Sequence, residues 1–552
     1  MAILPPRVSA ADFGAAIRQF EAAVGKEWVF TSDEDLFPYR DPFSMIKDQA
    51  NELIASAAVS PTTVEQVQAV VRTANQYKIP LYSISTGKNY AYGGASPNVR
   101  GSVIVDLKRM NKVLEVDADR NFCLVEPGVS YIDLYRYIQD RGLKVWIDTP
   151  DPGWGSPVGN ALDHGIGYTL GFYRDHMNAH CGMEVVLPSG EVMRTGMGAM
   201  PGSKTWQEYK HGFGPDPAGL FGQGNYGIVT KMGFRLMPQP EHWRNGLITV
   251  PRRRDLIGLV KTVNYMSDLF MCGEPWYGSP LRALMGNTEF REQATKASGF
   301  NDAELDRQAA AAGLHSWQVE LQFYGSEKTT LANWEYAKEL FARNVPGSRA
   351  VDGESLKIPL TKAQIENTTG PYPTNMRRNI TQGVPGLGVW YQTGRTEEHQ
   401  DRWNETHFGL FSAVPRSGEG VFEAQRVFTD IAHEMGIAGG NALLTPINWY
   451  QFSFLMASGF GAAGDQTAAG KKKQADLLRR IIKANAEHGW GDYRAPPLLQ
   501  DDVAEAYSWN NHVLRRFNET MKDAIDPNGI LSPGRGGIWP KAHRSLRGGL
   551  KS

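Results

Sequence analysis

Hydrophobic positions repeat with helical spacing in the segment that precedes a glycine-rich turn. A capping-box pattern at Thr62 to Glu65 begins this segment, and apolar residues then recur every three or four positions up to Tyr77. The short apolar run over 79–85 predicts a buried strand, and the chain then enters a turn that reaches Gly94. The predicted order is therefore helix, strand and glycine-rich turn.

The same patterns predict a mixed α+β fold along the rest of the chain. Before residue 240, the spacing predicts strands over 102–107, 122–128 and 182–187 and a helix over 131–141. Beyond Pro240 the helical stretches become longer and more charged, as in 255–269 and 329–343, with a strand expected over 317–323. This change of character predicts a domain boundary near residue 240.

Length and charge indicate the kind of ligand. A chain of 552 residues is too long for one ordinary core, so we expect two large domains or one domain with a big insertion. Its 58 Lys and Arg residues balance 59 Asp and Glu residues, for a net charge of -1. Nothing in this balance favours nucleic acid or an anionic membrane. We therefore expect a small-molecule ligand.

Cysteine and histidine spacing argues against metal or disulfide chemistry. Cys123, Cys181 and Cys272 form no C-x-x-C pair and are expected to be buried apolar side chains. The histidines show no zinc-like pairing with carboxylates, and this includes His164, His176, His180 and His211. The N-terminus has neither a signal-peptide pattern nor a membrane-spanning run, which predicts a cytoplasmic protein.

The turn from Ser85 to Asn89 has the composition of a phosphate cradle. Small residues after a buried strand expose several backbone N–H groups on one side, and Lys88 adds a positive charge. The segment matches neither a Walker A loop nor a Rossmann fingerprint. On composition alone, a plain structural turn is the favoured interpretation.

The order of the glycine-containing motifs changes this interpretation, because together they resemble the vanillyl-alcohol oxidase and 4-cresol dehydrogenase family of FAD enzymes. They cover nearly the whole chain, at 85–89, 92–94, 125–129, 159–160, 165–169, 182–187, 194–198, 224–234, 491–494 and 526–535. The resemblance implies an α+β FAD-binding domain over 1–240 that the C-terminal segment 496–552 completes, with an α+β cap domain over 241–495. Leu170 and Phe172 depart from the Pro and Gly that relatives often carry, so the pocket shape is expected to differ.

The resemblance also implies which residues bind the cofactor. The positions that match are Ser85, Thr86, Gly87, Lys88, Asn89, Gly159, Asn160, Gly227, Ile228 and Arg535. Many relatives attach the flavin covalently, and His407 is the expected linking residue, although the residues that follow it match poorly. Tyr391 is a lesser candidate, and noncovalent FAD stays open.

Five further residues match the catalytic positions of the family's 4-hydroxybenzyl branch. A para-hydroxybenzyl substrate loses hydride from its benzylic carbon more easily once the phenol is ionised, because the product is a neutral quinone methide. Phenols titrate near pH 10, so the site must stabilise a phenolate. Tyr92, Tyr493 and Arg494 are expected to surround that oxygen. Asp151 is expected near flavin N5 as a base that directs water or accepts a proton, and Tyr168 is expected to line the pocket.

The resulting functional prediction is an FAD-dependent oxidase of 4-alkylphenols, 4-allylphenols and vanillyl-type alcohols, the kinds of phenol that lignin yields. Molecular oxygen is the expected electron acceptor, with hydrogen peroxide released. The alternative is a dehydrogenase of similar substrate range that passes electrons to a cytochrome. A third possibility is a flavoprotein without para-phenol chemistry. A homodimer or larger homo-oligomer is expected from the resemblance.

Overall fold

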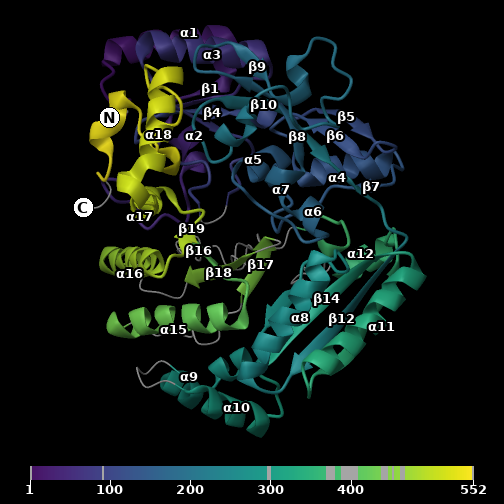
Figure 1. Cartoon of the computed structure of the whole chain (residues 1–552). Coiled ribbons are helices and arrows are strands. Elements are labelled where there is room, and N and C mark those ends of the chain that lie inside the picture. The colour runs from purple at the N-terminus through teal and green to yellow at the C-terminus, as the bar shows by residue number, and fades with distance from the viewer. Residues whose placement is uncertain are drawn as a thin grey trace.

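Elements from both ends of the chain lie together in the structure, a computed structural model. It describes residues 3–89, 92–294, 300–368, 380–386, 408–436, 446–450, 453–460 and 467–549. The N-terminal elements, purple to blue in Figure 1, lie beside the yellow C-terminal helices. The teal and green elements between them in sequence form the lower part of the view.

The first sheet carries the strand that leads into the glycine-rich turn. Its order is β1 (Val29–Phe30), β2 (Ala57–Val59), β4 (Val103–Asp106) and β3 (Leu81–Ile84). Strands β2 and β3 both run parallel to β4. Helix α3 (Val64–Tyr77) covers this sheet together with α1 (Ala10–Val24), and Val67, Val70 and Val71 are completely buried. Burial of each of these valines contributes about 1.5–3 kcal/mol. The buried apolar face of α3 confirms the predicted amphipathic helix.

The second sheet is antiparallel throughout. Its order is β5 (Val113–Asp117), β6 (Phe122–Val125), β10 (Ile228–Arg235), β8 (His180–Val186) and β9 (Val192–Arg194). Strands β3, β4, β6 and β8 confirm the strands that the sequence predicts over 79–85, 102–107, 122–128 and 182–187. The predicted helix is α4 (Tyr131–Asp140), whose capping box pairs Ser130 with Asp133.

Two four-stranded sheets form the lower part of the molecule in Figure 1. The first has the order β13 (Trp276–Gly278), β14 (Trp317–Gly325), β12 (His242–Val250) and β15 (Arg349–Lys357). The second has the order β17 (Pro446–Tyr450), β18 (Ser453–Phe460), β16 (Phe408–Val414) and β19 (Gly491–Asp492). Their helices, which share one hydrophobic core, are α8 (Leu256–Asp268), α11 (Glu327–Asn344), α15 (Gly418–Glu434) and α16 (Ala468–Glu487). Helices α8 and α11 and strand β14 confirm the predictions made beyond residue 240.

The C-terminal segment returns to the first sheet. After α17 (Gln500–Ala506) and α18 (Trp509–Ile525), Leu531 forms a parallel bridge with Leu81 of β3. The Leu81 amide donates to the Ile530 carbonyl at 2.6 Å, and the Ser532 amide donates to the Leu81 carbonyl at 2.8 Å. Strand β10 belongs to the second sheet, whereas β12 belongs to a sheet in the lower part of Figure 1. The domain boundaries at residues 240 and 495 stay predictions.

All three cysteines are buried, as the sequence predicts. Within the described ranges, no helix is both long and apolar enough to cross a membrane. Those ranges also hold no group of His, Cys, Asp or Glu side chains suited to a metal ion.

Candidate active site

The glycine-rich turn follows β3 directly and is tightly packed. Gly87 has a φ of +64°, and a Cβ at this position would lie 3.1 Å from Ile84 Cδ1. Gly93 has a φ of +100°, and a Cβ there would lie 2.6 Å from Pro497 Cγ. Both positions therefore require glycine, which leaves the backbone of the turn uncovered by side chains.

A short helix begins beside this turn. Helix α5 (Pro157–Leu162) is capped by Ser156, and a Cβ on Gly159 would overlap the Ser85 hydroxyl. The structure thus brings Ser85 and Gly159 together, as a shared cofactor site requires. Gly227 lies against Val185 just before β10, where a side chain would overlap it.

The remaining predicted cofactor positions differ in exposure. Thr86 is buried, whereas Lys88 is exposed. Ile228 begins β10 and is buried in the core beneath the first sheet. The predicted covalent site His407 and its alternative Tyr391 lie outside the described residues.

Three aromatic rings surround the guanidinium group of Arg494. The carbon atom Cζ lies 3.9 Å from the ring centre of Tyr92, 5.2 Å from that of Tyr493 and 5.7 Å from that of Phe411. Tyr493 and Arg494 follow β19, which pairs with β16, and the Tyr493 amide donates to the Phe411 carbonyl at 3.3 Å. The structure therefore brings together the three residues predicted for the phenol end of the site.

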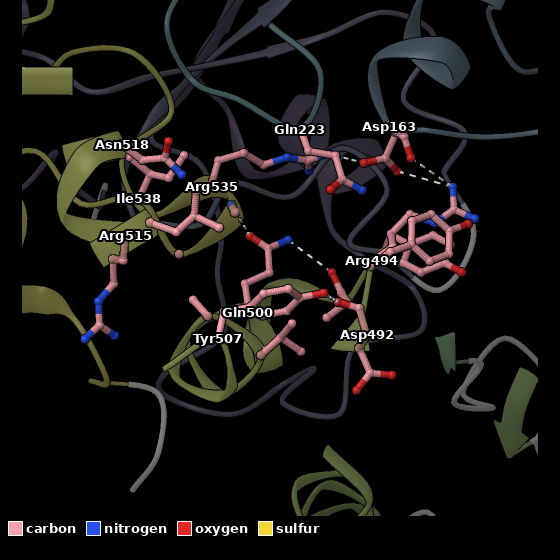
Figure 2. A pocket seen from close by; sticks show the side chains of 18 residues that line it. Asp163, Gln223, Asp492, Arg494, Gln500, Tyr507, Arg515, Asn518, Arg535 and Ile538 are labelled. Carbon is pink, nitrogen blue, oxygen red and sulfur yellow. Dashed lines mark hydrogen bonds and ion pairs between the residues drawn. The ribbon is translucent and has the colours of Figure 1, made fainter. Parts of the chain in front are cut away.

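Asp163 anchors this cluster and was not predicted from the sequence. Its carboxylate lies 3.7 Å from Arg494 Nη1 and accepts hydrogen bonds from Arg535 Nη2 at 2.6 Å and Asn89 Nδ2 at 2.7 Å. Figure 2 shows the side chains of Arg494 and Arg535 reaching Asp163 from two directions. The sequence offered one signal for it, an acidic residue directly after the short helix α5. Its partners Arg494 and Arg535, however, lie 331 and 372 positions further along the chain.

Burial keeps the two tyrosines of the cluster protonated. It raises the pKa of Tyr92 well above its ordinary value, although the Arg494 charge opposes the shift. It also raises the pKa of Tyr493 to about 12, again against the Arg494 charge. The Tyr92 hydroxyl is buried, and the described residues offer it no hydrogen bond of ordinary geometry. The cluster thus combines two neutral O–H groups with one permanent charge.

Asp151 and Tyr168 form a second group. The Tyr168 hydroxyl donates to Asp151 Oδ2 at 2.7 Å, and the Tyr168 ring meets the Trp276 ring edge-on at 5.7 Å. Tyr168 is buried, whereas Asp151 is partly exposed. The carboxylate is therefore oriented by one donor and still accessible to a small molecule.

A cavity of about 310 Å³ lies beside the Arg494 cluster, between it and helices α17 and α18. Asp492, directly before Tyr493, contributes to its wall. Its carboxyl accepts hydrogen bonds from Ser412 Oγ at 2.8 Å and Asn485 Nδ2 at 3.3 Å. Burial raises the pKa of this carboxyl to about 6, and these two bonds oppose the shift.

Comparison with known proteins gives the class of this chain. Residues 55–196 match the model of the FAD binding domain, a range that includes the glycine-rich turn and α5. The chain is 32% identical to the 4-cresol dehydrogenase [hydroxylating] flavoprotein subunit of Pseudomonas putida, over 97% of this chain and 98% of that one. These matches show a FAD-dependent oxidoreductase.

Solved structures agree over nearly the full length. The 4-ethylphenol oxidase from Gulosibacter chungangensis is 34% identical with a TM-score of 0.78, and 98% of this chain and 99% of that chain are covered. A substrate-bound p-cresol methylhydroxylase is 30% identical with a TM-score of 0.82 and the same coverage. The chain belongs to the vanillyl-alcohol oxidase and p-cresol methylhydroxylase family, and it has that family's two-domain α+β fold.

Proposed function

We propose that this enzyme oxidises para-substituted phenols at the benzylic carbon, with 4-alkylphenols, 4-allylphenols and vanillyl-type alcohols as substrates. The arrangement of Arg494 supports this proposal most strongly. Its guanidinium group lies among the rings of Tyr92 and Tyr493, and the side chain is only 12% exposed, so a phenolate oxygen gains more from this fixed cation than it would in water. The names of the two phenol-oxidising relatives agree with this substrate class.

The residues around the glycine-rich turn are suited to hold FAD. We assign the diphosphate to the turn from Ser85 to Asn89 and the start of α5, because glycine leaves the backbone bare at both places. We also assign Gly227, Ile228 and Arg535 to this site. When bound, FAD supplies the two-electron acceptor for the hydride of the substrate.

The phenol end and the carboxylate end have different tasks in this proposal. Tyr92 and Tyr493 donate hydrogen bonds to the phenolate while Arg494 balances its charge. Loss of hydride then leaves a quinone methide, whose benzylic carbon is electron-poor. Asp151, oriented by Tyr168, takes a proton from the water that adds there or from the hydroxyl of an alcohol substrate.

We propose molecular oxygen as the second substrate, with hydrogen peroxide as its product. The relative that is named an oxidase supports this acceptor. A cytochrome-linked reaction is the second candidate, because another relative over the full length is named a dehydrogenase. Covalent attachment of FAD through His407 and assembly into a homodimer or larger homo-oligomer remain part of the proposal.

An anaerobic stopped-flow experiment with 4-ethylphenol tests this function. We expect the flavin absorbance to bleach with 4-ethylphenol but not with 3-ethylphenol, because the meta isomer cannot form a quinone methide. Equal rates with both isomers, or no reduction by either, would overturn the proposal. Mixing the reduced enzyme with oxygenated buffer then separates the acceptors, since slow reoxidation would exclude the oxidase.

A further inference from the structure

A buried histidine makes polar contacts that lead toward both groups of the candidate site. Nε2 of His176, the first residue of α7 (His176–Ala179), lies 2.8 Å from Asp148 Oδ1, and both side chains are at most 2% exposed. Nδ1 lies 3.0 Å from the Tyr131 hydroxyl and 2.6 Å from Asn160 Oδ1. Both ring nitrogens therefore have polar partners, so the orientation of the ring is fixed.

The Asp148 side of the ring leads to the carboxylate group of the site. Asp148 Oδ2 accepts a hydrogen bond from the Thr169 amide at 2.8 Å and another from the Thr169 hydroxyl. Thr169 directly follows Tyr168, and Asp148 stands three positions before Asp151. A Cβ on Gly167 would overlap Asp148, so the two segments are packed without space to shift. Asp148 thus holds the backbone directly after Tyr168 and belongs to the same short segment as Asp151.

The Asn160 side of the ring leads to the other group. Asn160 lies in α5, and its carbonyl accepts hydrogen bonds from the amides of Asp163 and Gly165. Asp163 in turn pairs with Arg494 and Arg535. A displacement of α5 would therefore move the anchor of the Arg494 cluster and the Gly159 edge of the proposed cofactor site.

We propose that His176 is a positioning residue that couples the Asp151–Tyr168 pair, through Asp148, to helix α5 and the Arg494 cluster, through Asn160. This inference rests on the proposed phenol oxidation. Because the ring contacts Asp148 and Asn160 through different nitrogens, the two links can be broken separately.

Two amide substitutions separate the links. The amide of His176→Gln reaches the position of Nε2, so it keeps a donor for Asp148 but loses the contact with Asn160. The shorter side-chain amide of His176→Asn reaches only the position of Nδ1, so it keeps the contact with Asn160 but loses the contact with Asp148. We expect His176→Asn to slow flavin reduction at saturating 4-ethylphenol by about 100-fold, because a displacement of about 1 Å at a catalytic group has this effect.

The Asn variant should leave the KM for 4-ethylphenol within about threefold of the wild-type value, because the phenol end keeps its contacts. The Gln variant should reduce its flavin at close to the wild-type rate. Its flavin-to-protein ratio after purification should fall, because α5 loses a restraint. His211→Gln is the matched control, since His211 forms an exposed pair with Asp216 at 3.2 Å. It should change none of these quantities.

Melting temperatures and the flavin content of each purified variant distinguish coupling from a scaffold role. Flavin reduction by His176→Asn within about threefold of the wild-type rate would overturn the inference. So would the same pattern of losses in both His176 variants, including failure of both to fold. A wild-type enzyme whose flavin no para-substituted phenol reduces would overturn the proposed function, and this inference with it.

Discussion

The two ends of the proposed substrate site carry opposite charges and are built differently. At one end Arg494 lies among three aromatic rings and is anchored by Asp163. At the other end Asp151 accepts a hydrogen bond from Tyr168 and stays partly exposed. A guanidinium group is always charged, whereas a carboxylate can gain and lose a proton. The difference suggests that one end stabilises charge and the other transfers protons.

Removal of the cationic end should have the largest effect. We expect Arg494→Ala to lower kcat/KM for 4-ethylphenol by about 10³-fold, because a buried phenolate then loses its only permanent counter-charge in this proposal. Arg494→Lys should recover part of the loss, since it keeps the charge without the planar fork. Steady-state kinetics on flavin-loaded enzyme measure both variants. A loss below about tenfold for Arg494→Ala would mean that the cluster does not stabilise the transition state.

Removal of the anionic end should have a smaller effect of a different kind. Asp151→Asn is expected to lower kcat for vanillyl alcohol by about 10²-fold, a typical contribution of a general base. The KM should change little, because the phenol end remains intact. A higher KM with an unchanged kcat would contradict the division between the two ends.

Loss of the donor that orients Asp151 should have a milder effect. Tyr168→Phe removes one hydrogen bond to a carboxylate and keeps the ring against Trp276. We expect kcat to fall by about tenfold, the kinetic equivalent of roughly 1.4 kcal/mol. Tyr173→Phe, in a half-buried tyrosine nearby in sequence, is the control and should retain full activity. Equal kinetics for the two variants would remove Tyr168 from the proposed site.

The smallest effect is expected at Asp492, which lines the cavity directly before Tyr493, and it concerns stability. Its pKa is raised to about 6, so its protonated form stabilises the fold. That stability is present below about pH 4 and is lost as pH rises through 6. Two pKa units at about 1.4 kcal/mol each give an upper bound of about 3 kcal/mol. Asp492→Asn should therefore flatten the fall in melting temperature between pH 4.5 and pH 7.5. An unchanged profile would contradict this.

Local patterns explain why much of the fold was predictable. The apolar side chains that pack α3, β4, β6 and β8 into the core recur within a few neighbouring residues, so one short window of the sequence contains the whole signal. The glycine-rich turn could be recognised for the same reason. The prediction that this turn binds the cofactor depended on the order of many motifs, because a plain turn and a phosphate cradle have similar compositions.

Long-range contacts explain what was missed. Asp163 appears in the sequence as the end of a short helix, and only the fold brings Arg494 and Arg535 to it. Phe411 lies in β16 and completes the aromatic surroundings of Arg494 through strand pairing with β19. His176 showed no metal-like spacing, yet its partner Asp148 stands 28 positions earlier. Such contacts leave no periodic signal.

The proposed reaction depends above all on binding of the substrate as a phenolate at the Arg494 cluster. The most direct test is an absorbance titration of 4-cyanophenol, which has no benzylic hydrogen, bound to the flavin-loaded enzyme. We expect the pKa of bound 4-cyanophenol to lie roughly one to two units below that of free 4-cyanophenol. The variant Arg494→Ala should abolish this shift. If 4-cyanophenol bound to the wild-type enzyme had the same pKa as free 4-cyanophenol, the cluster would not bind its ligand as a phenolate.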